Sequence, residues 1–222
     1  MNNHWEWDLH TNLAIKALGE TFYMVGVTLL IGGLIGLALG LLLYSTRPGS
    51  ILAHRPVFSV LNLAVNIVRP IPFVILLVAV GPLTTLIAGK TIGTSAAIVP
   101  LTIAVAFGSS RIVEQNLVTI DPGIIEAARA AGAGPWRIIF TLLIPEALGP
   151  LILGFTFVFV AIIDMSAVAG AVGGGGIGNF ALAYGHQRWN QEVVWISVAL
   201  IVVLVQVVQL VGNRLARKAL RR

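Results

Sequence analysis

The chain has 222 residues, of which 57% are hydrophobic and only 10% are charged, with a formal net charge of +5. Because a soluble domain carries about 25% charged residues, this composition excludes an ordinary soluble domain and predicts an integral membrane protein. The positive charge does not indicate nucleic acid as a partner, since the basic residues lie mostly at the ends of apolar runs, where orientation in a lipid bilayer explains them.

Five apolar stretches are long enough to cross a bilayer, which takes about 20 residues of helix. They lie at about 21–44, 57–80, 94–110, 148–169 and 193–211. The first residues lack a basic region followed by a short apolar one, so we expect no cleaved signal peptide. The predicted fold is an all-α integral membrane protein with five transmembrane helices.

The basic residues predict how these helices are oriented. If the N-terminus lies outside, ten basic residues fall on the inner side and three on the outer side, and an excess inside is the usual bias. The inner set is Arg47, Arg55, Arg111, Arg129, Arg137, Arg214, Arg217, Lys218, Arg221 and Arg222, and the outer set is Lys16, Lys90 and Arg188. We therefore expect the N-terminus outside and the C-terminus inside, with the loop between the third and fourth spans in the cytoplasm.

The second span contains a charge, Arg69, about twelve residues from its start and thus near the middle of the bilayer. A charge at that depth is costly, and such residues commonly serve a function. Pro70 and Pro72 predict a break in the helix that frees backbone carbonyls. Arg69 is therefore either a pathway residue or a structural cation that caps those carbonyls. With Asn66, one turn earlier, and Pro72, it forms a candidate polar patch on a translocation pathway.

The loop after the third span predicts two short helices. Asp121 and Pro122 are typical of a helix start, and Gly132 of a helix end, while Gly134 and Pro135 begin a second helix that we expect to be broken at Pro145. The first helix is too short to persist alone in water and carries little charge. It either docks into a groove of another protein or packs as a hairpin on its own spans.

The fourth span holds the one acidic residue embedded in an apolar stretch, Asp164, with Met165 beside it. Asp164 is either a pathway or gate residue, for which Arg69 is a candidate ion-pair partner, or a charge near the outer interface, because Gly170 soon ends the span. The glycine run at 173–176 has no following Lys-Ser/Thr, so it is not a phosphate loop, and we expect tight packing or an outer gate there. The histidines lack metal-ligand spacing and the serines lack a triad, so we expect neither an enzyme nor a metal site.

The loop also carries a spaced motif: Glu126-Ala127-Ala128, then Gly132 after three residues, then Leu142-x-Ile144-Pro145 after nine more. It resembles the EAA signature of ABC importer permeases, with Leu and Ile exchanged at its two aliphatic positions. Further stretches resemble the permeases of methionine ABC importers, and the resemblance covers roughly residues 18–215. These stretches are LLLYSTRPGS, NIVRPIPFVILLVAV, AAIVPLTIA, RIVEQNL and AVAGAVGGGGIGNFALAYGHQRW.

The resemblance implies a permease domain at 18–208 between an extracytoplasmic segment at 1–17 and a basic cytoplasmic tail at 212–222. It implies a coupling helix that docks on a cytoplasmic ATPase, with Glu126, Ala127, Ala128, Gly132 and Pro145 as coupling residues. It further implies a homodimer in the bacterial cytoplasmic membrane, with two ATPases and a substrate-binding lipoprotein. ATP and Mg²⁺ would sit on the ATPase and no cofactor on this chain.

The substrate implied by the resemblance is methionine, as either stereoisomer, or a close analogue. The resemblance weakens at Asp164-Met165, where the methionine permeases typically have other residues, so another small amino acid or polar solute is an alternative. A different class of protein, an ion-coupled secondary transporter or a channel, would use Arg69 and Asp164 as its polar core. Such transporters usually have repeat-related halves, and no internal repeat is evident in this sequence.

Overall fold

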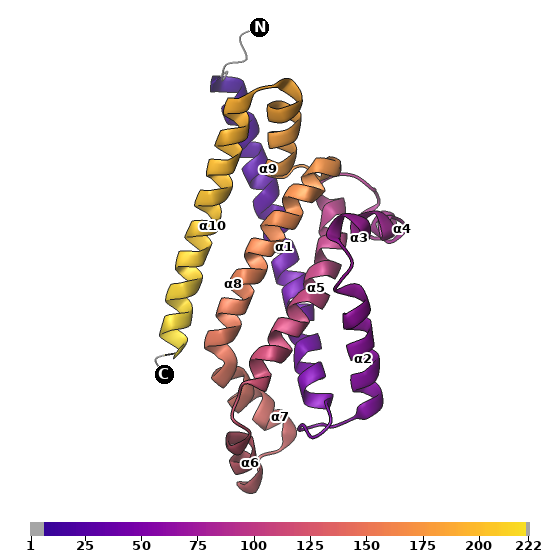
Figure 1. The fold of residues 1–222 in the computed structure, drawn as a ribbon, viewed down its shortest axis with the longest axis vertical. Coiled ribbons are helices and arrows are strands. Elements are labelled where there is room, and N and C mark those ends of the chain that lie inside the picture. The colour runs from indigo at the N-terminus through magenta and orange to yellow at the C-terminus, as the bar shows by residue number, and fades with distance from the viewer. Residues whose placement is uncertain (1–6, 221–222) are drawn as a thin grey trace. The chain divides into compact units, whose positions relative to one another are not determined.

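The computed structural model describes residues 7–220, and within that range helices are the only regular secondary structure. This confirms the predicted all-α fold (Figure 1). Residues 1–6 of the predicted N-terminal segment, and Arg221 and Arg222 of the predicted basic tail, lie outside the described residues. The longer helices are α1 (Trp7–Thr46), α2 (Arg55–Val68), α5 (Thr94–Val118), α8 (Ile144–Ala169) and α10 (Gln191–Leu220). The shorter helices are α3 (Phe73–Ala79), α4 (Gly81–Ala88), α6 (Pro122–Ala130), α7 (Pro135–Ile138) and α9 (Gly176–Asn179).

Four helical stretches of the described chain are long and apolar enough to cross a bilayer, and the pair α2 and α3 makes a fifth if it is counted as one broken span. The four are His10–Thr46, Thr94–Val118, Pro135–Gly174 and Gln191–Leu220. These stretches are longer than the predicted spans because hydropathy marks only the part of a helix that lies in lipid. Helix α1 begins inside the predicted segment 1–17, and α10 continues to Leu220 through most of the predicted tail.

The predicted break in the second span is confirmed. Helix α2 ends at Val68 with Arg69 as its C-cap, and α3 starts after Pro72, whose ψ of 134° is extended rather than helical. The cause is chemical, since prolines at 70 and 72 remove two backbone donors and disfavour helix at the residues before them.

The predicted break at Pro145 is wrong, because the chain passes through it as a helix. A π-helical turn, Ile139–Leu143, leads directly into α8, and Pro145 lies in the first turn of that helix. Pro145 has no N–H and therefore donates no hydrogen bond to the preceding turn. The wider π turn just before it leaves room for the proline ring.

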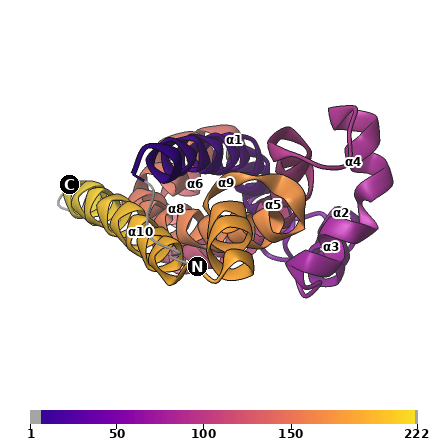
Figure 2. The same ribbon diagram turned by 90° about the horizontal axis from the view of Figure 1, so that it is seen from above.

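The described chain divides into two compact units. The first contains α1 up to Gly32, Ile71–Val105 and Val158–Val208, and the second contains Gly33–Pro70, Ala106–Phe157 and the chain from Gln209 onward. In the first unit, α9 and the turns around it lie beside the N-terminal part of α1, as both views show (Figures 1 and 2). Phe180 and Ile177 are buried there against Ala14, Ala17 and Val193.

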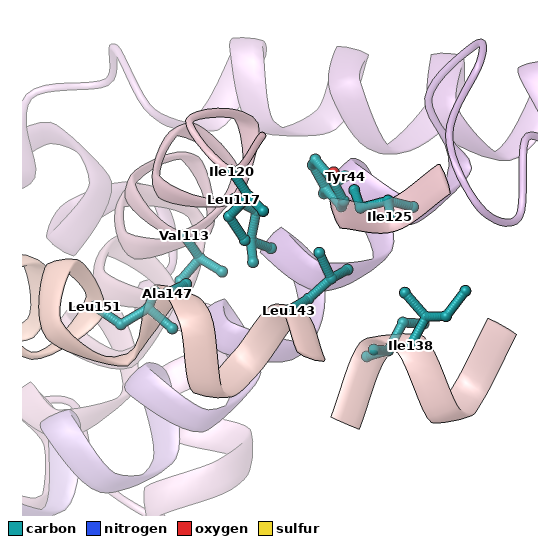
Figure 3. Packing of buried hydrophobic residues seen from close by; sticks show 10 residues of the cluster. Tyr44, Val113, Leu117, Ile120, Ile125, Ile138, Leu143, Ala147 and Leu151 are labelled. Atoms are coloured by element: carbon teal, nitrogen blue, oxygen red, sulfur yellow. The ribbon is translucent and has the colours of Figure 1, made fainter. Parts of the chain in front are cut away.

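The core of the second unit joins the end of α1, the end of α5, α6, α7 and the start of α8. Its buried side chains point toward one another in Figure 3. They are Tyr44, Val113, Leu117, Ile120, Ile125, Ile138, Ile139, Leu143, Ala147 and Leu151. Because side chains from five elements meet in one cluster, α6 is fixed to the end of α5 rather than hanging from it as a free loop.

Candidate functional site

Helix α6 forms as its end signals predict. Asp121 is the N-cap, its Oδ1 accepting a hydrogen bond from the Gly123 N–H at 2.8 Å, and Pro122 occupies the first helical position. At the other end Gly132 has a φ of +81°, and the Ala133 N–H donates to the Ala128 carbonyl at 3.0 Å. A glycine in the left-handed region with a bond back to the last turn is a common helix C-terminus.

One side of α6 packs against its own chain and the other does not. Ile125 is buried and lies beside Tyr44 in Figure 3. Glu126 and Ala127 are exposed, and so is Ile124, with 39% of its surface accessible. The hairpin alternative therefore accounts for the Ile125 side, while the opposite side exposes small residues together with the charges of Glu126 and Arg129.

A cleft of about 330 Å³ runs beside α6 in the second unit, between this helix and the turn after α1. Glu126 and Arg129 of α6 line one side, and Tyr44, Arg47 and Ser50 line the other. The exposed side of α6 thus continues into a concave surface lined in part by polar and charged side chains.

The proposed coupling residues are brought together only in part. Glu126, Ala127 and Ala128 share α6, with Gly132 just after it, whereas Pro145 lies in the first turn of α8. Ala128 is partly buried and packs against the core of the second unit. The cluster connects these two places, since Ile125 of α6 and Leu143 just before α8 both belong to it.

The candidate pathway residues of the second span lie at the end of α2. Arg69 and Pro72 are exposed, and Arg69 makes no hydrogen bond or ion pair through its side chain with another described residue of its own unit. Asn66 makes its side-chain hydrogen bond with Arg111 rather than with Arg69. Its Oδ1 accepts a hydrogen bond from Arg111 Nη2 at 2.6 Å.

Asp164 and Met165 belong to the first unit. Asp164 is exposed, and no residue described in that unit pairs with it. Met165 is half-buried and packs against a core cluster of Met24, Ala97, Leu101 and Ala169. Met165 is thus held by packing, whereas the Asp164 side chain is exposed.

The glycine run is held by the side chains of α1. The Gly176 N–H donates to Glu20 Oε2 at 2.7 Å, and the Ile177 N–H donates to Thr21 Oγ1 at 2.9 Å. Lys16 of the same helix forms an ion pair with Glu20, with 3.9 Å between Nζ and Oε1. The run is therefore a tightly packed segment of the first unit, as one of the two sequence-based alternatives predicts.

Arg111 heads a polar cluster that sequence reasoning did not identify. It pairs with Glu114 at 2.5 Å and donates through Nη2 to Asn62 and Asn66 of α2. In the sequence Arg111 counts only as one more cytoplasmic base. The signal that could have found the cluster is the i, i+3 spacing of Arg111 and Glu114 next to an apolar span, together with two asparagines one turn apart on α2.

The part of the chain from 7 to 220 holds no group of three His, Cys, Asp or Glu side chains able to bind a metal ion. The surfaces to which the sequence-based predictions point are the exposed side of α6 with its cleft, the end of α2, and the region around Asp164 and the glycine run.

Comparison with known proteins agrees with this picture. The sequence profile of the family described as binding-protein-dependent transport system inner membrane component matches residues 32–221. The probable D-methionine transport system permease protein MetI of Vibrio cholerae is 40% identical over 210 residues, covering 95% of this chain and 93% of that protein. The methionine import system permease protein MetP of Bacillus subtilis is 41% identical and covers 78% of each chain.

Solved structures give the same result. A crystal form of the MetNI methionine ABC transporter in an inward-facing conformation contains a chain that is 40% identical, with a TM-score of 0.94, covering 97% of this chain and 99% of that one. An amino acid ABC transporter crystallised with histidines shares the fold at 21% identity and a TM-score of 0.79. The resemblance to methionine-importer permeases is confirmed, and the chain belongs to the family of inner membrane components of binding-protein-dependent transport systems.

Proposed function

We propose that this chain is the permease subunit of an ATP-driven importer that moves methionine, as either stereoisomer, or a close analogue, into the bacterial cell. The observation that carries the proposal is α6, a capped helix that exposes small residues and two charges beside a polar cleft. Similarity to methionine permeases over nearly the whole chain supports the substrate.

In this proposal the chain crosses the inner membrane five times. The second span consists of α2 and α3 with the break between them, and the other four follow the long apolar helices. The N-terminus lies outside and the C-terminus inside, with residues 1–17 as the outer segment, 18–208 as the permease domain and 212–222 as the cytoplasmic tail. The excess of basic residues on the inner side supports this orientation.

The energy comes from a partner, because the chain itself is a transport subunit and not an enzyme. Two cytoplasmic ATPase subunits bind ATP and Mg²⁺ and receive α6 of each permease in a homodimer, while this chain binds no cofactor. Glu126 contacts the ATPase electrostatically, Ala127 and Ala128 allow close approach, and Gly132 and Pro145 shape the two ends of the loop. Closure of the ATPase pair then moves α6 and switches the spans between inward-open and outward-open states.

The candidate residues of the translocation pathway or its gate are Asn66, Arg69, Pro72, Asp164 and Met165. The exposed side chains of Arg69 and Asp164 support this assignment, because a charge in a span is usually kept for a function. A lipid-anchored binding protein delivers the substrate at the outer face.

Purification of the native complex and uptake of labelled methionine test the proposal together. A cytoplasmic ATPase should co-purify, and Gly132→Asp or Ala128→Phe should abolish uptake while the permease still inserts into the membrane. Absence of an ATPase, with uptake driven by an ion gradient, would identify a secondary transporter or channel instead. Normal uptake and normal ATPase stimulation in both variants would show that α6 is not the docking helix.

A further inference from the structure

The polar cluster around Arg111 joins two helices of the second unit. Arg111 lies on α5, and its Nη2 donates to Asn62 Oδ1 at 2.8 Å and to Asn66 Oδ1 at 2.6 Å, both on α2. Its Nη1 donates to Glu114 Oε2 at 2.5 Å. Only 17% of the Arg111 side chain and 8% of the Glu114 side chain are exposed.

Packing alone does not explain this arrangement. A buried ion pair loses hydration on folding and commonly stabilises no better than apolar side chains of the same volume. Its advantage is geometry, since the planar guanidinium holds several acceptors in fixed directions. Here Arg111 Nη1 donates to Glu114, and Nη2 donates to the two asparagines of α2. These hydrogen bonds hold α2 in one register on α5.

The same part of α5 is tied to α6. Two residues after Arg111, Val113 enters the buried cluster, followed one turn later by Leu117. Ile125 of α6 belongs to that cluster, and only residues 119–121 separate α5 from α6. A displacement of α6 is therefore passed to α5, because a close-packed core transmits displacement rather than absorbing it.

At its other end α2 stops at the break that carries Arg69. Asn66 is three residues before Arg69, and Asn62 is one turn earlier. A continuous set of contacts thus runs from α6 through the core to α5, from Arg111 to α2, and along α2 to the candidate pathway.

We propose that Arg111, held by Glu114, is a positioning residue that passes the movement of α6 to α2 through Asn62 and Asn66. This inference rests on the proposed function, since it assigns a route to the coupling that the ATPase drives. Its effect is on transport per ATP hydrolysed rather than on assembly or on hydrolysis itself.

The test compares three variants of α2 in the purified permease–ATPase complex reconstituted in liposomes with the binding protein. Asn62→Leu removes an acceptor while keeping the shape of the side chain and the Arg111–Glu114 pair. Asn62→Asp keeps an oxygen acceptor at the same place. Ser59→Leu, at an exposed position of the same helix, is the matched control for adding leucine.

In Asn62→Leu we expect methionine transported per ATP hydrolysed to fall by roughly two- to thirtyfold, with hydrolysis close to the wild-type rate. Asn62→Asp and Ser59→Leu should keep the wild-type ratio. An unchanged ratio in Asn62→Leu overturns the inference. So does a parallel loss of assembly, melting temperature and hydrolysis in that variant, since the cluster would then be purely structural. If the wild-type complex neither binds an ATPase nor transports, the proposed function fails, which is a different outcome.

Discussion

At the scale of single residues, the glycine run is required by geometry. Gly175 and Gly176 have φ values of +81° and +74°, a region that side chains of L-residues rarely adopt. A Cβ built on Gly176 would lie 2.7 Å from Thr21 Oγ1, the atom that accepts the Ile177 N–H. Any side chain at 176 therefore strains the backbone and pushes on the two bonds that hold the run to α1.

We predict that Gly176→Ala destabilises the protein by about 1–3 kcal/mol, the usual range for a residue forced into a sparsely populated backbone region. The measurement is thermal unfolding of the purified protein in detergent. Gly19→Ala is the control, because Gly19 lies within α1 with open space around its Cβ position. Alanine there should be neutral or stabilising by up to about 1 kcal/mol. Equal melting temperatures for the two variants would contradict this account.

Contacts between residues close in the sequence could be predicted, whereas contacts between residues far apart in the sequence could not. The Asp121 cap and the Gly132 turn follow from local backbone chemistry and are both confirmed. The hydrogen bond from Gly176 to Glu20 joins residues 156 positions apart in the sequence, and the bond from Arg111 to Asn62 joins residues 49 positions apart. Such pairs depend on how helices pack, which a single sequence does not specify.

At the scale of helices, three glycines at a spacing of four lie on one face of α1 and allow α5 to approach closely. In the first unit, a Cβ on Gly32 would lie 3.0 Å from the Thr102 carbonyl oxygen. In the second unit, a Cβ on Gly36 would clash with Ser109, and one on Gly40 would lie 2.5 Å from Val113 Cβ. Small residues at such contacts are a main source of helix association in lipid, where water does not drive apolar surfaces together.

We therefore predict that Gly40→Val is poorly tolerated. Its Cβ would also lie 2.6 Å from the backbone oxygen of Ser110, an atom that cannot rotate away. Overpacking of this kind costs about 1–3 kcal/mol or more, which should appear as a lower melting temperature and a lower yield of monodisperse protein. Gly26→Val, at an open position of the same helix, should behave like the wild type. The glycine spacing is unimportant if both variants are equally stable.

The long helices could be predicted because an apolar stretch of bilayer length must pair its own backbone N–H and C=O groups in lipid, and a helix does so within one segment. The break at 70–72 followed from two prolines in one turn. Continuity through Pro145 could not be predicted, because it depends on the π-helical turn before that residue. Helices α4 and α9 were also missed, since helices of eight and four residues form only where tertiary contacts hold them.

At the scale of the whole molecule, the proposed function and the proposed orientation depend on each other. Only a cytoplasmic α6 can meet a cytoplasmic ATPase. The ten-to-three distribution of basic residues supports both, because an excess of Lys and Arg is typical of the cytoplasmic side, on which the proposed orientation puts α6. A reversed orientation would put α6 where no ATP is available and would remove the basis of the coupling scheme.

The absence of cysteine from the sequence makes this orientation directly measurable with single-cysteine variants. Ala53→Cys and Gly134→Cys lie at exposed positions on the proposed inner side, and Lys90→Cys and Gln187→Cys at exposed positions on the proposed outer side. In intact spheroplasts a membrane-impermeant maleimide should label the outer pair, and it should label the inner pair only after permeabilisation. Labelling of Gly134→Cys in intact spheroplasts would place α6 outside. Because that result would separate α6 from every source of ATP, it would refute the importer mechanism even though the fold and the family were unchanged.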